Sequence, residues 1–241
     1  MKVVAIVQAR MGSTRLPGKV LQDLSGKSVL GRVVERLHKS RLINDVVIAT
    51  TNLSKDDLIV EECRRSSVSF FRGSETDVLD RYFQAARTSR ADIVVRVTSD
   101  CPLIDPGITD ETIEAFLHGE ADYAANTLAR TYPRGLDTEV FSMATLQRAW
   151  HGARQDYERE HVTPYIIEHP AEFRLLSVTG DCDFSTYRWT LDTSEDLAFV
   201  RSVYSRFASG NVFSWREVLE LLEREPELAT LNHGVVQKAI R

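Results

Sequence analysis

The fold class of this chain is decided near its start, by the stretch VVAIVQ at 3–8 and the loop ARMGSTRLPGK at 9–19 that follows it directly. The apolar run is continuous, and most of its residues are β-branched, which predicts a strand buried on both faces. Such strands form parallel sheets with helices on both sides, and open sheets of this kind bind ligands at the carboxyl ends of their strands. The loop at 9–19 is therefore a candidate ligand-binding segment.

Strand-like runs alternate with helical periodicity through the first half of the chain, and the pattern loosens after residue 105. The predicted strands lie at 3–8, 46–50, 68–71, 92–98, 122–126, 138–141, 173–178 and 187–191. The predicted helices lie at 28–40, 55–66, 76–90, 108–118, 143–154, 158–168, 194–207 and 214–224. Ser54 and Asp57 predict a capping box for the second helix. We expect an α/β fold, a three-layer αβα sandwich with a mixed, mostly parallel sheet, as a single domain over 1–241.

Composition narrows the class of protein. The 241 residues are 43% hydrophobic and 27% charged, which is typical of a globular protein. No run approaches the roughly 18 apolar residues of a membrane helix, and the run at 3–7 is too short for a signal peptide. The three cysteines form no CxxC pair, so we expect reduced thiols in a cytoplasmic protein without a membrane partner. They are Cys63, Cys101 and Cys182.

The net charge of −5 argues against nucleic-acid binding, but the charge is unevenly distributed. Residues 1–41 contain nine Lys and Arg against two acids, a net charge of +7, so the remaining residues carry −12. This contrast suggests a local anion site. We interpret Arg32, Arg36, Lys39 and Arg41 as a solvated helix face, and assign the anion site to the loop at 9–19.

The loop has the composition that a triphosphate requires. Two glycines allow backbone N–H groups to approach an anion, two hydroxyls add donors, and three cations supply charge. These residues are Gly12, Gly18, Ser13, Thr14, Arg10, Arg15 and Lys19. A Walker A motif is excluded because five residues separate the glycines and Val20 replaces the required Ser or Thr, and no GxGxxG is present. Any metal must therefore be held by carboxylates elsewhere.

Three places offer such carboxylates. Asp100 follows the strand at 92–98 and should lie in the same crevice as the loop. Asp192 follows the apolar run at 189–191, although the neighbouring Thr193 and Asp196 also predict a capping box, of which Asp192 could simply be a part. Asp181-Cys182-Asp183 spells DxD, a metal motif of glycosyltransferases that also occurs by chance in acidic turns.

The loop QARMGSTRLPGK at 8–19 resembles the signature of the cytidylyltransferases that make CMP-activated acidic sugars, the CMP-Kdo and CMP-sialate synthetases. The resemblance is closer to the spore-coat polysaccharide biosynthesis F-type branch, and it covers residues 1 to about 205. The further blocks that carry it are FRGSE at 71–75, DVLDRY at 77–82, RVTSDCPLID at 96–105, YPRGLDTEVF at 132–141, EREHVTPY at 158–165 and RWTLD at 188–192.

This resemblance implies a Rossmann-like nucleotide-diphospho-sugar transferase fold, and transfer of CMP from CTP to an acidic sugar with release of pyrophosphate. It implies Mg²⁺ bound by Asp100 and Asp192, a homodimer, and a role in surface polysaccharide biosynthesis. The implied nucleotide-binding residues are Ala9, Arg10, Gly12, Ser13, Thr14, Arg15, Lys19, Arg72 and Asp100, of which Arg10, Lys19 and Asp100 would be catalytic.

The related synthetases place their sugar-binding residues in the second half of the chain. We expect an acceptor-binding and dimerisation insertion at about 120–190, where an arginine would bind the carboxylate of the sugar. The candidates are Arg134, Asp137, Glu139, His161 and Arg188, and for each arginine a surface ion pair is the competing interpretation. Two other functions remain open: a glycosyltransferase that uses Asp181 and Asp183, and a non-catalytic nucleotide-binding protein.

Overall fold

A computed structural model describes residues 1–207 and 212–238. Its main feature is a seven-stranded sheet in the order β5-β4-β1-β6-β8-β7-β9. The strands are β1 (Val3–Gln8), β4 (Asp45–Thr51), β5 (Ser69–Gly73), β6 (Ile93–Thr98), β7 (Tyr123–Ala125), β8 (Glu139–Ser142) and β9 (Leu175–Ser177). β8 alone in this sheet runs against its neighbours, pairing antiparallel with β6 and β7, while the other pairs are parallel. The expectation of a mixed, mostly parallel sheet is confirmed.

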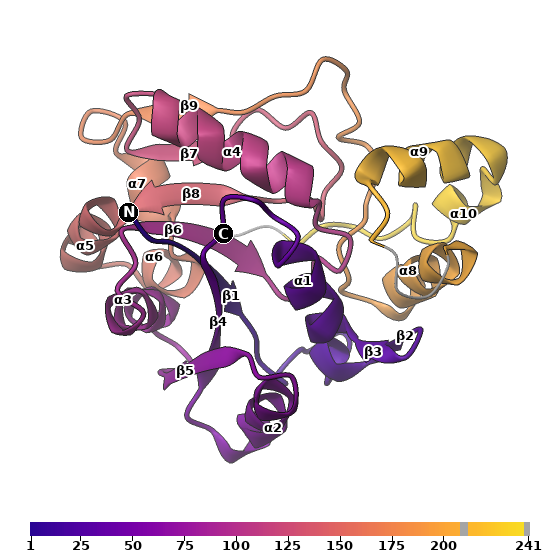
Figure 1. The fold of residues 1–241 in the computed structure, drawn as a ribbon, viewed down its shortest axis with the longest axis horizontal. Coiled ribbons are helices and arrows are strands. Elements are labelled where there is room, and N and C mark those ends of the chain that lie inside the picture. Colours follow the sequence, from indigo (N-terminus) through magenta and orange to yellow (C-terminus); the bar gives the residue numbers. More distant parts are fainter. Residues whose placement is uncertain (208–211, 239–241) are drawn as a thin grey trace.

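Helices cover both faces of the sheet, giving three layers (Figure 1). One face packs against α1 (Val29–Leu37), α2 (Asp57–Arg65) and α4 (Pro106–His118). The other packs against α3 (Val78–Thr88), α5 (Met143–Gly152), α6 (Asp156–His161) and α7 (Pro164–Glu168). The side-chain alternation of β1 produces this arrangement, because Val3, Ala5 and Val7 enter the first core while Val4 and Ile6 enter the second.

A third apolar cluster lies beside the sheet and contains α8 (Ser194–Arg206), α9 (Trp215–Arg224) and α10 (Glu227–Thr230). The fully buried Trp189 and Leu191 belong to this cluster, so the segment before Asp192 is fixed by apolar packing. A small antiparallel hairpin, β2 (Asp23–Leu24) with β3 (Lys27–Ser28), and the 3₁₀ turns η1 (Lys19–Leu21) and η2 (Ser54–Asp56) complete the elements. The hairpin and α10 were not predicted.

Three local predictions were wrong. Ser54 begins a 3₁₀ turn, and the N-cap of α2 is Asp56, whose side chain caps no helix N–H because it binds elsewhere. The predicted helix at 158–168 is two helices, α6 and α7, separated at Val162, whose φ is +74°. The predicted strand at 187–191 is reduced to a single bridge between Arg188 and Arg134.

The interpretation of Arg32 and Arg36 as solvated was also wrong. Arg36 is 1% exposed and donates to the carbonyl oxygens of Ile104 and Phe213. Arg32 is also buried and donates to the carbonyl oxygen of Leu24. Both guanidinium groups therefore satisfy buried backbone acceptors between α1 and its neighbours, whereas Lys39 is exposed as predicted.

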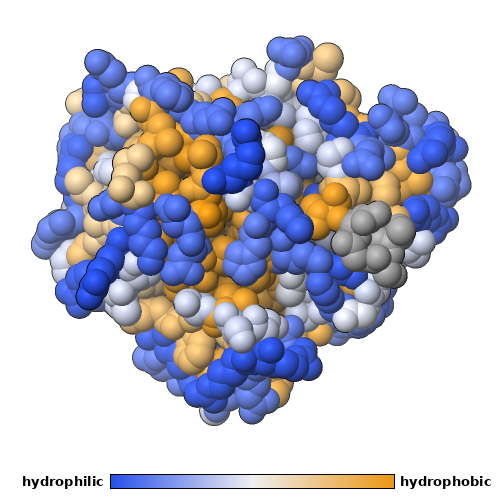
Figure 2. Space-filling view, in the orientation of Figure 1, coloured by the Kyte–Doolittle hydropathy of each residue, from blue (hydrophilic) through white to orange (hydrophobic). Residues whose placement is uncertain are grey.

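Most large apolar side chains are buried, and a few are exposed at the surface. Figure 2 shows apolar side chains over part of α4 and in the centre of this face, bordered by hydrophilic residues. Leu117 of α4 is 37% exposed. Within residues 1–207 and 212–238, no helix is long and apolar enough to cross a membrane.

Candidate functional site

The loop after β1 is fixed at its base by backbone bonds and one buried carboxylate. The N–H of Met11 donates to Oδ1 of Asp56 (2.7 Å), and Oδ2 of this fully buried aspartate accepts from the hydroxyl of Thr51. Gly18, at φ +70°, donates its N–H to the carbonyl of Met11 and closes the loop. This closure turns the chain into η1, which begins at Lys19.

Lys19 points back into the sheet edge and binds both predicted metal ligands. Its Nζ lies 2.8 Å from Oδ2 of Asp100 and 2.8 Å from Oδ1 of Asp192. The carbonyl oxygen of Leu191 is a third acceptor at 2.8 Å. Burial acts to lower the pKa of Lys19, but the two carboxylates outweigh it and raise that pKa above its ordinary value.

Asp100 follows β6, as the sequence indicated. Its Oδ1 accepts from the hydroxyl of Thr98 at 2.6 Å, which orients the carboxylate. Burial acts to raise the pKa of Asp100, but Lys19 and the Thr98 hydroxyl outweigh it and hold this pKa below its ordinary range. The ammonium of Lys19 and the Thr98 hydroxyl thus favour the ionised form of Asp100.

Asp192 is placed by the start of α8. Thr193 and Asp196 form the predicted capping box, and Asp196 also accepts the N–H of Asp192. The side chain of Asp192 is left free to face the loop, where Oδ2 accepts from Arg15 and from Arg188, both at 2.9 Å. The capping box and the carboxylate site are therefore both present and use different groups.

The other predicted nucleotide-binding residues differ in their exposure and in their hydrogen bonds. Thr14 is exposed, and Ser13 is half-buried with its Oγ accepting the N–H of Leu16. Ala9 is buried and its N–H is bound to Ala49. Gly12 lies under an ion pair that the sequence did not indicate, Lys55–Glu75, since a Cβ added to Gly12 would meet Nζ of Lys55 at 3.0 Å.

Two predicted arginines, Arg10 and Arg72, contact other residues and form no ion pair with these carboxylates. Arg10 is 44% exposed and its Nη2 lies 4.0 Å from Oε1 of Glu160. Arg72 binds the carbonyl oxygens of Thr51 and Leu53 and forms an ion pair with Asp57. The structure therefore shows Arg72 joining β5 to the segment after β4.

Two of the acceptor-end candidates, Asp137 and Arg188, lie near Arg134. Arg130 binds Asp137 through both carboxylate oxygens, at 2.6 and 2.9 Å. The guanidinium of Arg134 has no hydrogen-bond or ion-pair partner among the residues described, and burial, with Arg130 next, lowers its pKa. Gly135 makes this placement possible, because at φ +109° it passes so close to Trp189 that a Cβ would lie 2.5 Å from the Trp189 carbonyl carbon.

The remaining acceptor-end candidates differ in their burial and in the partners that they already have. Glu139 is buried and accepts from Arg96 and from the hydroxyl of Tyr123 (2.8 Å). Burial lowers the pKa of His161. The charge of Glu160 acts to raise this pKa, and the charges of Arg96 and Arg10 act to lower it further. Arg188 is paired with Asp192 and Asp196.

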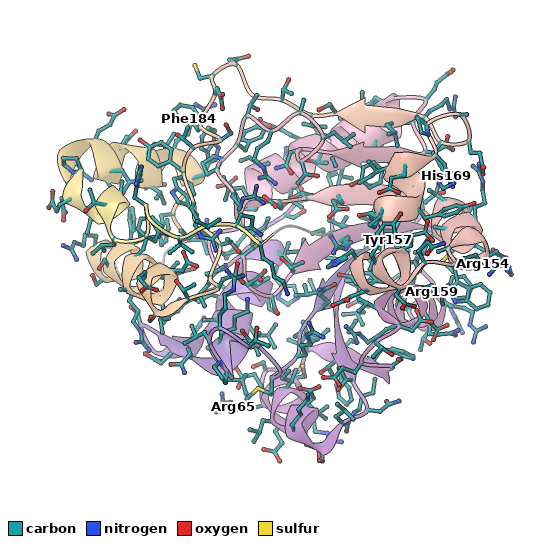
Figure 3. The ribbon with its side chains drawn as sticks, turned by 180° about the vertical axis from the view of Figure 1, so that it is seen from behind. Arg65, Arg154, Tyr157, Arg159, His169 and Phe184 are labelled. Atoms are coloured by element: carbon teal, nitrogen blue, oxygen red, sulfur yellow. The ribbon has the colours of Figure 1, made fainter. Side chains whose placement is uncertain are left out.

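Arg159, another arginine in this region, is used structurally. It lies on α6 on the side of α3 (Figure 3) and binds both carboxylate oxygens of Asp77, the N-cap residue of α3.

The family model described as Cytidylyltransferase matches residues 4–234. This chain belongs to the cytidylyltransferase family. The chain is 35% identical to the spore coat polysaccharide biosynthesis protein SpsF of Bacillus subtilis, over 95% of this chain and 97% of that protein.

Solved structures agree with this assignment. A cytidylyltransferase from Leptospira borgpetersenii is 38% identical to this chain. The match covers 99% of this chain and 100% of that one, with a TM-score of 0.91. The CMP:2-keto-3-deoxy-manno-octonic acid synthetase, solved in complex with CTP, has a TM-score of 0.67 at 18% identity, over 86% of this chain and 99% of its own. At that identity the second likeness shows the fold alone, an α/β fold of the class that the sequence predicted.

The DxD segment of this cytidylyltransferase makes no hydrogen bond or ion pair with Lys19, Asp100 or Asp192. Asp181 and Asp183 are exposed in the loop after β9, and Oδ1 of Asp183 accepts the N–H of Ser185. The neighbouring Phe184 packs against Trp215 of α9, at the far edge of the third cluster (Figure 3). Nothing in this loop contacts the predicted phosphate-binding residues.

A cavity of about 1060 Å³ lies between α1 and α2 of the cytidylyltransferase and contains none of the predicted site residues. Its floor is apolar, and its rim carries charges that are mostly paired, such as Lys27 with Glu35. The chemistry of the loop, and not the size of this cavity, identifies the candidate active site.

Proposed function

We propose that this cytidylyltransferase transfers CMP from CTP to an acidic sugar, with release of pyrophosphate, in the biosynthesis of a surface polysaccharide. Family membership supports the nucleotidyl transfer. The name of the Bacillus relative supports the polysaccharide role, and the complex of the synthetase with CTP supports the nucleotide. The proposed partners are CTP and the sugar, without a nucleic acid or a membrane. We also propose a homodimer formed through residues of about 120–190, which sedimentation velocity tests.

The observation that carries the proposal is the meeting of the loop at 9–19 with two carboxylates. Lys19 and Arg15 come from the loop, and Asp100 and Asp192 come from the ends of two separate segments. Cations for a triphosphate and oxygen ligands for its metal are thereby within one site. Phosphoryl and nucleotidyl transfer depend mainly on such positioning and charge neutralisation.

The residues present suit Mg²⁺. Asp100, Asp192 and the Leu191 carbonyl are hard oxygen donors, and a cation, the ammonium of Lys19, already lies among them. No three His, Cys, Asp or Glu side chains are grouped for a metal in the described parts of the chain, so the nucleotide phosphates would complete the ligand set. When bound, Mg²⁺ would neutralise phosphate charge and polarise the attacking hydroxyl.

The side chains of the loop would supply the rest. Lys19 and Arg10 would stabilise charge that develops on the phosphates during attack at the α-phosphate, and Arg15 would bind the outer phosphates. Backbone N–H groups near Gly12 and the hydroxyls of Ser13 and Thr14 would add donors. The sugar hydroxyl would be aligned with the leaving pyrophosphate by the acceptor-end residues.

Arg134 indicates the charge of the sugar. It is a half-buried guanidinium without a protein anion of its own, beside Arg130 and Arg188, which are both paired. A carboxylate would match this fork with two parallel hydrogen bonds. We therefore assign the sugar carboxylate to Arg134.

Nucleotide binding tests the proposal first. Calorimetry in Mg²⁺ should show tighter binding of CTP than of ATP, GTP or UTP, since each polar group left unpaired in a base pocket costs about 1–3 kcal/mol. Lys19→Ala should weaken CTP binding by about 1.5–3 kcal/mol, while the exposed Lys39→Ala stays at wild type. Equal affinity for all four nucleotides would refute the cytidylyl assignment.

The acceptor is tested by pyrophosphate release from CTP with matched sugars. We expect turnover with carboxylated 2-keto sugars and little with their neutral analogues. Arg134→Lys should raise KM for the sugar without changing CTP affinity, because an ammonium cannot make the bidentate contact. Turnover that is unaffected by both changes would exclude an acidic acceptor bound by Arg134.

A further inference from the structure

The ammonium of Lys19 has no hydrogen left for a phosphate. It carries three donors, and its three acceptors, each at 2.8 Å, are Asp100, Asp192 and the Leu191 carbonyl. Its side chain is 11% exposed, so little of it is accessible to water. In this conformation Lys19 occupies the position between the carboxylates and is not presented to a triphosphate.

Arg15 binds one of the same two carboxylates, that of Asp192. Its Nη2 lies 2.9 Å from Oδ2 of Asp192, and it belongs to the same loop as Lys19. The two negative charges of Asp100 and Asp192 are thus matched by two positive charges of the loop. Arg188 also contacts Asp192 but has its own counter-charge in the buried Asp196.

We propose that Lys19 and Arg15 make metal binding conditional on the nucleotide. Without nucleotide they neutralise Asp100 and Asp192 and keep divalent cations out. When the triphosphate binds, both side chains leave the carboxylates for the phosphates, and the carboxylates become available to the cation that accompanies the nucleotide. This inference rests on the proposed function and concerns the order in which its components assemble.

The exchange conserves charge, which is why it is physically reasonable. The carboxylate pair gives up two single positive charges and accepts one divalent cation. The triphosphate gains the two single charges that the pair gives up. No buried carboxylate is left without a counter-charge at either end, an arrangement that would be strongly unfavourable.

The experiment measures metal binding without nucleotide, with Mn²⁺ as the probe and electron paramagnetic resonance to count free Mn²⁺. Wild type should bind Mn²⁺ weakly at this site. Lys19→Gln, which removes the charge but keeps much of the side-chain length, should bind it about tenfold tighter or more, because one cation no longer competes for the carboxylates. Lys39→Gln is the matched control and should equal wild type.

A second readout covers the case in which Lys19→Gln is too unstable to purify well. Arg15→Ala removes a cation that contacts Asp192 but not Asp100, and should give a smaller increase in Mn²⁺ affinity. Thermal unfolding should show a larger Mg²⁺-induced rise in Tm for both variants than for wild type, because a ligand that binds only the folded state stabilises it. The double variant Lys19→Gln, Asp192→Asn should lose the gain.

The outcomes separate this inference from the proposed function. If wild type and Lys19→Gln bind Mn²⁺ equally without nucleotide, the inference is overturned, whatever CTP does. If Lys19→Gln gains Mn²⁺ affinity but CTP binds no better than other nucleotides, the exchange stands and the cytidylyl proposal fails. If the gain survives Asp192→Asn, the metal binds elsewhere and the inference is overturned.

Discussion

Asp100 and Asp192 share the single ammonium of Lys19, although 92 positions separate the two aspartates in the chain. Residues that act on one group behave as a unit, and the effects of removing them do not add. The two side chains should therefore be studied together as well as singly.

Asp100→Asn and Asp192→Asn should each lose most of the activity, because the amide keeps one oxygen but removes the charge that binds the cation. The double variant should be little worse than either single one. Partial rescue by raised Mg²⁺ or by Mn²⁺ is expected. Steady-state pyrophosphate release measures all three variants.

Asp181→Asn is the control for this series and should remain near wild type, since Asp181 lies exposed in the loop after β9. Loss of turnover in Asp181→Asn together with an active Asp192→Asn would reverse the assignment and favour the glycosyltransferase reading of the DxD. Three silent variants would place the metal site elsewhere.

Asp196 should control stability in acid. Burial acts to raise its pKa, but bonds from Arg188 and Asn232 outweigh it and hold this pKa below its ordinary value of 3.8. A lowered folded-state pKa contributes stability above the unfolded value, and this stability is lost as the pH falls below about 3.8 through the folded pKa. The free energy of unfolding should thus fall more steeply in wild type than in Asp196→Asn between about pH 4 and pH 2. Urea titrations at several pH values measure the slopes, and identical slopes would contradict the assignment.

Among structural elements, the turn at Gly135 matters most for the acceptor end. It brings the segment of Arg134 against that of Arg188, with backbone atoms of Trp189 and Thr190 filling the space where a Cβ would lie. The two segments therefore pack only if residue 135 has no side chain.

Gly135→Ala should lower the free energy of unfolding by about 2–4 kcal/mol, from backbone strain at φ +109° together with the clash. It should also raise KM for the sugar more than for CTP, because Arg134 moves while the loop at 9–19 does not. Gly234→Ala, where a Cβ meets nothing within 4 Å, is the matched control. Denaturant unfolding and kinetics on the same samples measure both effects.

At the start of α8, one interaction could be predicted from the sequence and another could not. The capping box of Thr193 and Asp196 is a local pattern, and it was predicted correctly. That Asp196 also binds Arg188 could not be predicted, since this bond depends on the chain path set by Gly135 and Trp189. The Ser54 box failed because Ser54 begins a 3₁₀ turn and α2 starts only at Asp57. The side chain of the actual N-cap residue, Asp56, accepts the N–H of Met11 instead of capping the helix.

At the scale of the whole molecule, Arg36 joins the helical layer of α1 to the third cluster. Its guanidinium satisfies the carbonyl oxygens of Ile104, before α4, and of Phe213, before α9. From sequence alone its spacing on α1 matched a solvated stripe, because nothing local indicates that α8 and α9 will pack over that side of the helix. The order of strands β8, β7 and β9 in the sheet likewise could not be predicted from local sequence patterns.

Arg36→Met should therefore destabilise the entire protein, leaving two buried carbonyl groups without donors at a cost of about 2–4 kcal/mol. Nucleotide affinity should change little, since Arg36 touches none of the loop residues. Lys39→Met, exposed one turn further along, should be neutral. Unfolding by urea, followed by circular dichroism, would contradict this role if the two variants had the same midpoint.

The long separation between Lys19 and its partners also has a consequence during protein synthesis. The loop is made among the first residues, whereas Asp192 follows Lys19 by 173 positions. At about 5–20 residues per second, a ribosome needs roughly 9–35 s to cover that distance. Asp100 is made 81 positions after Lys19, so for the rest of this interval the nascent chain carries a basic loop that still lacks one of its two carboxylate partners. Until the segment of Asp192 has been made and has folded, the cations of the loop are available to other anions, and the complete ion-pair cluster can form only late in synthesis.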